Sequence, residues 1–169
     1  MAVTPLTIDD VNRMDRDGFV TAFAHVYEST PALAAAAWRH HPFADRAELV
    51  SAFRTAADEL DERGVLTLLR AHPQLAAAGP MTTDSRAEQR AAGLTDLDDE
   101  TRARIVSANA RYVEQFGFPF ILAVRGLGPA DIAASLDERI GHDANEERAT
   151  ALAQVQRIAE LRIDQLVAP

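Results

Sequence analysis

The stretch DLDDETRARIVSANARYVEQFGFPFILAVRG, residues 96–126, contains the two signals that decide the fold class. Its first part predicts a long helix, which Asp96 or Asp98 caps and Gly117 ends, because acidic side chains begin helices and glycine commonly ends them. The side chains expected to face inward recur at helical spacing: Ile105, Ala108, Asn109, Tyr112 and Phe116. The second part, FPFILAV at 118–124, is a continuous apolar run, and its pattern does not distinguish a buried strand from a buried helix.

Helical signals also dominate on both sides of this stretch. The first helices expected upstream follow Thr7 and Asp15 and run from Thr30-Pro31 to Trp38. The next runs from Asp45 to near Gly64, and VLTLLRAH continues helically to Pro73. A loop at 74–82 then precedes a short helix through Ala92, which Asp84 or Thr83 caps. Downstream, Gly128-Pro129 opens a helix to about Ile140, and residues 145–167 form a last amphipathic helix. We therefore predict an all-α fold, a single-domain bundle of roughly eight helices over residues 1–169.

Composition restricts the chemistry and the partners of this chain. It has 169 residues, a formal net charge of -9 and no cysteine, so thiol catalysis, disulfides and cysteine-based zinc sites are excluded. Such an acidic chain repels nucleic acid and anionic membranes. No segment has the roughly 18 apolar residues of a membrane span, and the first residues lack a secretory signal. We expect a cytoplasmic protein with no nucleic acid partner and no membrane association.

Two neighbouring motifs are candidates for chemistry. In RAHPQLA, residues 70–76, Pro73 biases His72 away from helical geometry and places an imidazole where a helix stops. Histidine titrates near neutrality and suits proton transfer. The alternative is a surface or half-buried histidine at a helix end with no catalytic role. In SRAEQ, the side chains Ser85, Glu88 and Gln89 share one helical face and offer groups for a polar heterocycle, or they form a solvated helix start.

Two further features are compatible with a binding site. If FPFILAV is irregular and buried, its backbone groups need partners, and a bound ligand is one such partner; a plain core segment is the alternative. Arg162 lies among apolar neighbours in IAELRI, where a buried arginine needs an anion, whereas a surface arginine would extend to solvent. The adjacent pairs His40-His41 and His142-Asp143 lack metal-ligand spacing, so no metal site is expected.

Taken in order along the chain, these motifs resemble a known family. The series HPFADRAEL (41–49), LLRAHPQLA (68–76), SRAEQRAAGL (85–94), NARYVEQFGFPFILAVRG (109–126) and ERATALAQVQRIAELRI (147–163) resembles the decarboxylases that act on 2-oxo-4-hydroxy-4-carboxy-5-ureidoimidazoline (OHCU), a product of urate oxidation, and yield (S)-allantoin. The resemblance implies an all-α bundle, no metal or organic cofactor, and a homodimer.

The resemblance also assigns roles to residues of this chain. It implies that His72 and Glu88 are catalytic. The substrate-binding residues that it implies are Pro73, Ser85, Gln89, Phe120, Ile121, Leu122, Ala123, Val124 and Arg162. Many members carry an acidic residue where this chain has Gln74, so tuning of the histidine by that acid is not expected here.

We hypothesise that His72 protonates the carbon that loses CO2, with the substrate ring as its own electron sink. The opposite order, in which His72 first removes the hydroxyl proton, stays open. Three alternative hypotheses for the function are a related cofactor-independent lyase with a different substrate, a non-catalytic helical interaction module, and a metal-dependent hydrolase.

Overall fold

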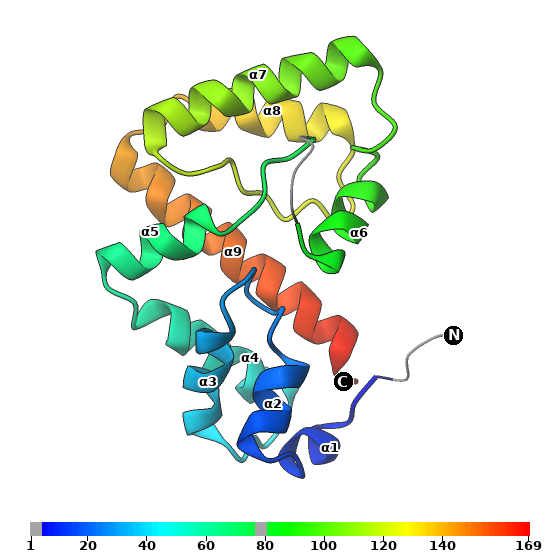
Figure 1. Ribbon diagram of the computed structural model, residues 1–169, viewed down its shortest axis with the longest axis vertical. Helices are drawn as coiled ribbons and strands as arrows, with labels where there is room; N and C mark the ends of the chain where they lie inside the picture. The colour runs from blue at the N-terminus through cyan, green and yellow to red at the C-terminus, as the bar shows by residue number, and fades with distance from the viewer. Residues whose placement is uncertain (1–4, 77–80) are drawn as a thin grey trace. The chain divides into compact units, whose positions relative to one another are not determined.

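A computed structural model describes residues 5–76 and 81–169 of the chain and confirms the all-α fold (Figure 1). The helices are α1 (Ile8–Asn12), α2 (Arg16–Ala22), α3 (Pro31–Ala37), η1 (Trp38–His40, a 3₁₀ turn), α4 (Arg46–Asp58), α5 (Glu62–Arg70), α6 (Thr83–Ala91), α7 (Asp99–Phe116), α8 (Pro129–Arg139) and α9 (Ala144–Leu166). Within the described ranges, extended structure is limited to one bridge between Leu6 and Val167. Those ranges also hold no helix long and apolar enough to cross a membrane.

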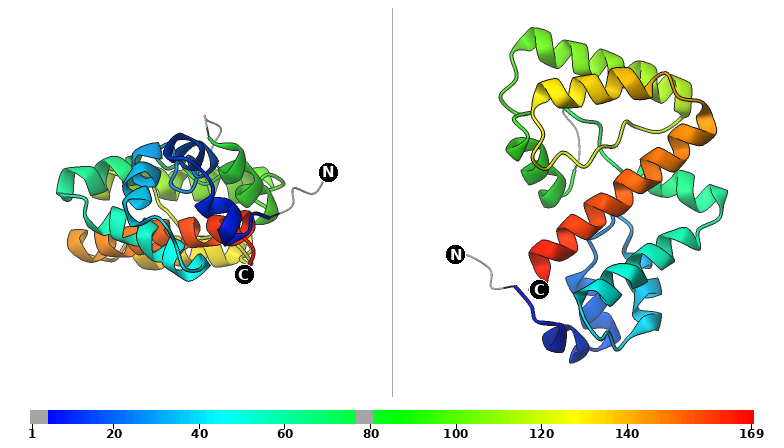
Figure 2. Two further views of the ribbon diagram at one scale, coloured as in Figure 1. Left: turned by 90° about the horizontal axis from the view of Figure 1, so that it is seen from below. Right: turned by 180° about the vertical axis from the view of Figure 1, so that it is seen from behind.

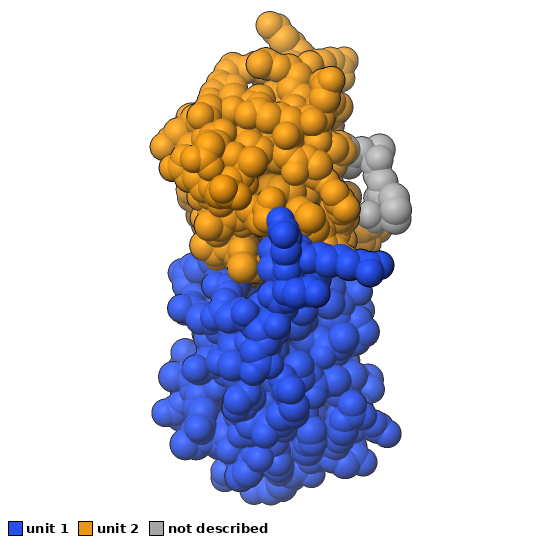
Figure 3. Space-filling view, turned by 90° about the vertical axis from the view of Figure 1, so that its left-hand side faces the viewer, with its two compact units in different colours: residues 1–65, 156–169 blue, residues 66–155 orange. Residues whose placement is uncertain are grey.

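The chain divides into two compact units, coloured separately in Figure 3. The first unit comprises residues 1–65 and 156–169, and the second comprises residues 66–155. Two helices cross these boundaries in sequence, because α5 contains residues on both sides of position 65 and α9 on both sides of position 155. Each unit is described by itself below.

The first unit is built around an aromatic cluster. Phe19 of α2 lies against Phe23, Phe53 and Trp38, with ring centroids 4.6, 6.0 and 5.1 Å away, and its own side chain is fully buried. Helix α3 packs against both α2 and α4 and so closes this cluster. Burying each such ring contributes about 1.5–3 kcal/mol, which accounts for the helical spacing of the aromatic residues in this part of the sequence.

The second unit pairs α7 with α8, and an irregular segment runs beside them. The two helices lie side by side in Figure 1 and in the right-hand view of Figure 2. Ile105 and Tyr112 of α7 and Ile132 and Leu136 of α8 are fully buried, at the positions that helical spacing predicts for an inward face. Gly117 ends α7 in a left-handed conformation, with φ of +80°, as the sequence predicts for a glycine cap.

The structure differs from one sequence expectation about a helix boundary and answers one question that the sequence left open. The helix predicted from Asp45 to near Gly64 ends at Asp58, and a new helix begins at Glu62, because the Asp61 carboxylate accepts a hydrogen bond of 2.7 Å from the Gly64 N–H and starts a second helix. The run 118–124 is neither strand nor helix.

Candidate active site

His72 lies just beyond the end of α5, on backbone that two buried leucines hold in place. Leu68 and Leu69 of α5 are buried, and the His72 N–H donates to the Leu69 carbonyl at 3.3 Å. Pro73 has no N–H and cannot extend the helix, so the chain leaves helical geometry here as the sequence predicts. The His72 residue is 7% exposed, which places the imidazole in a largely buried position rather than on the open surface.

A hydrogen bond to the backbone sets the orientation of this imidazole. The His72 Nδ1 lies 3.0 Å from the Leu68 carbonyl oxygen. A carbonyl oxygen only accepts, so Nδ1 carries a hydrogen in either protonation state of the ring. Proton exchange at His72 therefore occurs at Nε2, and the ring orientation is defined by a contact within its own helix end.

Helix α6 carries the polar face that the SRAEQ motif predicts. Thr82 caps this helix by accepting from the Ser85 N–H at 3.2 Å, whereas the sequence indicated Thr83 or Asp84 as the cap. Ser85 and Gln89 are buried and Glu88 is half-buried, so the three side chains share an inward face as their spacing predicts.

Gln89 joins this face to the turn that follows His72. Its Oε1 accepts from the Ala76 N–H at 3.0 Å, and its Nε2 donates to the Gln74 carbonyl at 3.4 Å. Ala76 has a φ of +58°, in the left-handed region that costs a non-glycine residue about 1–2 kcal/mol. Arg102 of α7 also donates to the Ala76 carbonyl, at 3.2 Å. The residues 77–80 of the predicted loop lie outside the described ranges.

The irregular segment 118–124 is buried, and side chains from three helices bind its backbone. Phe120 N–H donates to the Asn109 Oδ1 at 3.1 Å, and Ala123 N–H donates to the Gln154 Oε1 at 3.0 Å. The Ile121 carbonyl accepts from Arg139 at 2.7 Å. These contacts answer the question that the sequence raised, because polar side chains replace the hydrogen bonds that a strand or helix would provide.

The backbone N–H and C=O of Leu122 are not bound by these side chains. A trans peptide places its C=O and N–H on opposite sides, so the Leu122 N–H points away from the Ile121 carbonyl and from Arg139. For the same reason the Leu122 carbonyl points away from the Ala123 N–H and from Gln154. With respect to residues 5–76 and 81–169, neither backbone group of Leu122 makes a hydrogen bond. Leu122 is half-buried, and it offers one donor and one acceptor to a ligand.

Arg162 belongs to the first unit, where it forms a buried ion pair. Its Nη1 lies 3.1 Å from Glu28 Oε2 and donates to the His25 carbonyl at 2.9 Å. Arg162 and Glu28 are 3% and 1% exposed. Of the two alternatives that the sequence left open, the structure has the buried arginine with an anion, and that anion is Glu28, which the sequence did not single out.

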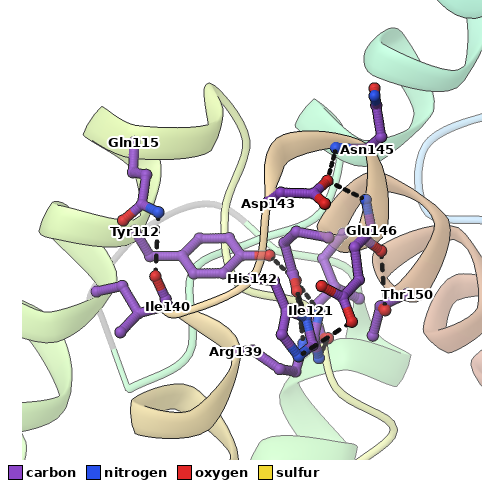
Figure 4. A network of polar contacts seen from close by, with 11 residues as sticks. Tyr112, Gln115, Ile121, Arg139, Ile140, His142, Asp143, Asn145, Glu146 and Thr150 are labelled. Atoms are coloured by element: carbon purple, nitrogen blue, oxygen red, sulfur yellow. Dashed lines mark hydrogen bonds and ion pairs between the residues drawn. The ribbon is translucent and has the colours of Figure 1, made fainter.

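The second unit contains a buried polar network that the sequence analysis missed (Figure 4). Glu147 is fully buried and accepts from Arg139 Nε at 3.0 Å, from the Tyr112 hydroxyl, and from His142 Nδ1 at 2.8 Å. Burial, and then the hydrogen bond to Glu147, raise the pKa of the Tyr112 hydroxyl well above its usual range.

Helical spacing carried a signal for this network. Arg139 follows Ile132 and Leu136 by seven and three residues, so it lies on the apolar face of α8. Glu147 precedes Ala151 and Val155 by four and eight residues on the apolar face of α9. No group of three or more histidine, aspartate or glutamate side chains in the described ranges has an arrangement suited to a metal ion.

Comparison with known proteins gives concordant matches. The family model described as OHCU decarboxylase matches residues 12–164. A 2-oxo-4-hydroxy-4-carboxy-5-ureidoimidazoline decarboxylase of Haloferax volcanii is 42% identical over 158 residues, covering 94% of both chains. The Mus musculus protein of the same name is 39% identical over 161 residues, covering 93% of this chain and 90% of its own.

Two solved structures have the same fold. The crystal structure of an (S)-allantoin synthase superposes with a TM-score of 0.79 at 26% identity, over 96% of this chain and 54% of that chain. A crystal structure of an OHCU decarboxylase in the presence of (S)-allantoin has a TM-score of 0.72 at 22% identity, over 86% of this chain and 96% of that one. The first of these structures is therefore of a chain that extends well beyond the matched region.

Proposed function

The chain belongs to the OHCU decarboxylase family, and we propose that it converts OHCU to (S)-allantoin in urate degradation without a cofactor, with His72 as the proton donor. The observation that carries the role of His72 is its Nδ1 contact with the Leu68 carbonyl. This contact leaves Nε2 as the nitrogen that gains and loses a proton, on an imidazole held in one orientation.

The reaction needs a positioned acid more than a strong one. The bond between the ring carbon and its carboxylate breaks, CO2 leaves, and the electron pair moves into the conjugated ring. That carbon then takes a proton from His72 Nε2 on one face, which gives one enantiomer. A positioned general acid contributes about 10²- to 10⁴-fold in rate.

The reverse role has a distinct pH signature. If His72 donates the proton, kcat falls as pH rises through the pKa of His72 in the enzyme–substrate complex, because the protonated form is required. If His72 first removes the hydroxyl proton, kcat falls as pH decreases through that pKa. The direction of the pH dependence of kcat therefore separates the two assignments.

The α6 face supplies the polar groups for the substrate ring. We assign Glu88 to the substrate hydroxyl or ureido N–H, and Ser85 and Gln89 to the polar edge of the ring. Support comes from their shared inward face and from the Gln89 contacts with the turn that follows His72 and Pro73. In this proposal Gln89 has a second task, since it holds the left-handed turn in place.

The wall of the site is the backbone of Phe120 to Val124. Leu122 supports this assignment, because its N–H and C=O are adjacent and directed away from the side chains that hold the neighbouring peptide groups. An amide-like edge of the substrate, with one N–H and one C=O, is complementary to such a pair.

Arg162 is assigned to a substrate carboxylate or carbonyl oxygen. Its support is that a chain of net charge -9 needs local positive charge to bind an anion, and that Arg162 is a buried cation on α9. Its pairing with Glu28 fixes the guanidinium, which limits the side-chain entropy lost on binding.

The decisive test is His72→Asn, measured by the optical activity of allantoin formed from freshly generated OHCU. The substrate is expected to decay spontaneously, so the enantiomeric excess is a safer measure than substrate loss. We expect a loss of about 10²-fold or more in rate and a racemic product. The exposed His40→Asn is the matched control and should behave as wild type. An unchanged rate and enantiomeric excess in His72→Asn would exclude the assignment.

The second candidate is a related cofactor-independent lyase with another substrate. Gln74 favours it, because it replaces an acidic residue that many members carry beside the histidine. Racemic allantoin formed at the background rate by the wild-type chain would support this alternative.

We further propose that residues 1–169 act as one domain and that the protein is a cytoplasmic homodimer. The match of one family model across residues 12–164, which include parts of both units, supports the single domain. The homodimer rests on the family resemblance, and the cytoplasmic location carries over from the expectation that the sequence set. Light scattering of the purified chain and fractionation of cells test them.

A further inference from the structure

The proposed substrate wall is held by a buried cation. Arg139 Nη1 donates to the Ile121 carbonyl at 2.7 Å (Figure 4). The guanidinium carbon lies 4.5 Å from the centre of the Phe120 ring. Arg139 is 4% exposed. One side chain thus binds two consecutive residues of the irregular segment, by a charge-assisted hydrogen bond and by a cation–π contact.

Glu147 fixes the direction of that cation. Its Oε1 accepts from both Arg139 Nε at 3.0 Å and Arg139 Nη2 at 2.5 Å. The same carboxylate accepts from the Tyr112 hydroxyl and from His142 Nδ1 at 2.8 Å. Because both oxygens are engaged and the pair is bidentate, the guanidinium has one well-defined orientation, with Nη1 directed at Ile121.

By holding the Ile121 carbonyl, Arg139 also sets the direction of the Leu122 N–H, which faces the proposed substrate site. The Ile121 carbonyl and the Leu122 N–H belong to one planar trans peptide and point in opposite directions. Holding the carbonyl toward Arg139 therefore fixes where the Leu122 N–H points. Segment 118–124 has no regular backbone hydrogen bonds of a strand or helix to fix its peptides, so the contact with the Arg139 side chain fixes this one.

We propose that Arg139 is a positioning residue for the decarboxylation, which acts through the Ile121 carbonyl on the direction of the Leu122 N–H. This inference rests on the proposed function, because it takes the backbone of residues 120–124 as the substrate wall. Glu147 is the partner that holds Arg139, and neither side chain is required to touch the substrate.

The test is Arg139→Lys, which keeps the positive charge beside Glu147. A lysine ammonium is a single point and cannot bind Glu147 in two places while it reaches the Ile121 carbonyl. We expect KM for OHCU to rise about 10- to 100-fold, with a smaller fall in kcat and a reduced enantiomeric excess of (S)-allantoin. Enzyme amounts are adjusted so that catalysed and spontaneous rates keep the same ratio as for wild type. Arg104→Lys, at the exposed pair with Asp137, is the matched control.

The outcomes separate the inference from the proposed function. If the wild-type chain forms no (S)-allantoin above background, the proposed function and the inference both fail. If wild type forms it and Arg139→Lys keeps the wild-type KM and enantiomeric excess, only the inference is wrong. A fall in kcat alone, with KM and enantiomeric excess unchanged, also overturns it, because that pattern reflects fewer folded molecules. If Arg139→Lys does not fold, the double variant Arg139→Met, Glu147→Leu takes its place with the same expected changes.

Discussion

Each compact unit contains a buried arginine–glutamate pair, and the two pairs differ in what the arginine connects. Arg162 binds Glu28 and the His25 carbonyl, which lie three residues apart on one turn after α2. Arg139 binds Glu147 on α9 and the Ile121 carbonyl, which are 26 residues apart in sequence. The first pair therefore binds a single turn to α9, whereas the second binds α9 and an irregular segment to one arginine of α8.

This difference indicates what a buried ion pair contributes in each place. A buried pair is often no more stabilising than apolar residues of the same volume. In the second unit the pair contributes orientation. The guanidinium offers several donors at fixed angles, and segment 118–124 lacks the regular backbone hydrogen bonds of a helix or strand. The difference between the two pairs should appear in the free energy of unfolding of four kinds of variant.

The largest effect is expected for removal of one partner in the second unit. Glu147→Ala leaves Arg139 buried without its anion, and it also removes the acceptor of Tyr112 and His142. We expect a loss of about 3–5 kcal/mol in the free energy of unfolding, measured with urea. Glu28→Ala in the first unit should fall at the lower end of that range, since each arginine keeps its carbonyl acceptor but Glu147→Ala also leaves Tyr112 and His142 without theirs. Equal losses would contradict the distinction between the two pairs.

Replacing both charges should restore much of that stability. In the double variant Arg139→Met, Glu147→Leu no buried charge is left alone. The remaining cost is the Ile121 carbonyl without its donor, together with Tyr112 and His142 without the acceptor that Glu147→Ala also removes. Each buried group left without its partner costs about 1–3 kcal/mol. The measurement is again urea unfolding. A double variant less stable than Glu147→Ala would show that the pair stabilises the unit directly.

A smaller effect is expected for Tyr112→Phe, about 1.5–3 kcal/mol near neutral pH, because it removes one hydrogen bond to a charged group. Burial raises the pKa of Tyr112 in the folded protein above the unfolded value of about 10. Its contribution is therefore complete below pH 10 and is lost as pH rises toward the folded pKa. Wild type should lose stability above pH 10 more steeply than Tyr112→Phe. The residual decline in the variant is assigned to Tyr27, whose pKa burial also raises.

The smallest effect is expected at an exposed pair. Arg104 and Asp137 lie 2.9 Å apart with side chains that are 66% and 60% exposed. Asp137→Ala should change the free energy of unfolding by less than about 1 kcal/mol, and the change should shrink further in high salt. A loss comparable with that of Glu28→Ala would remove burial as the cause of the difference.

The sequence predicted helices well where the apolar period is regular and the caps are specific. Asp98 and Gly117 bound α7 as expected, and Pro129 opens α8. The break at Asp61 was missed because an aspartate within a continuing apolar pattern acts as a cap only once its side chain binds the Gly64 N–H. The cap of α6 was misplaced by one or two residues for a similar reason, since three successive side chains there are able to cap.

What the sequence by itself determined is the all-α class, the end of α5 before His72 and Pro73, and the shared face of Ser85, Glu88 and Gln89. These follow from local rules: the period of a helix, the missing N–H of Pro73, and the three- and four-residue spacing of helical neighbours. The tertiary structure alone decided that 118–124 is irregular and which side chains hold it. An apolar run has no period that specifies its conformation, so its backbone hydrogen bonds depend on Asn109, Arg139 and Gln154, which only folding brings within reach.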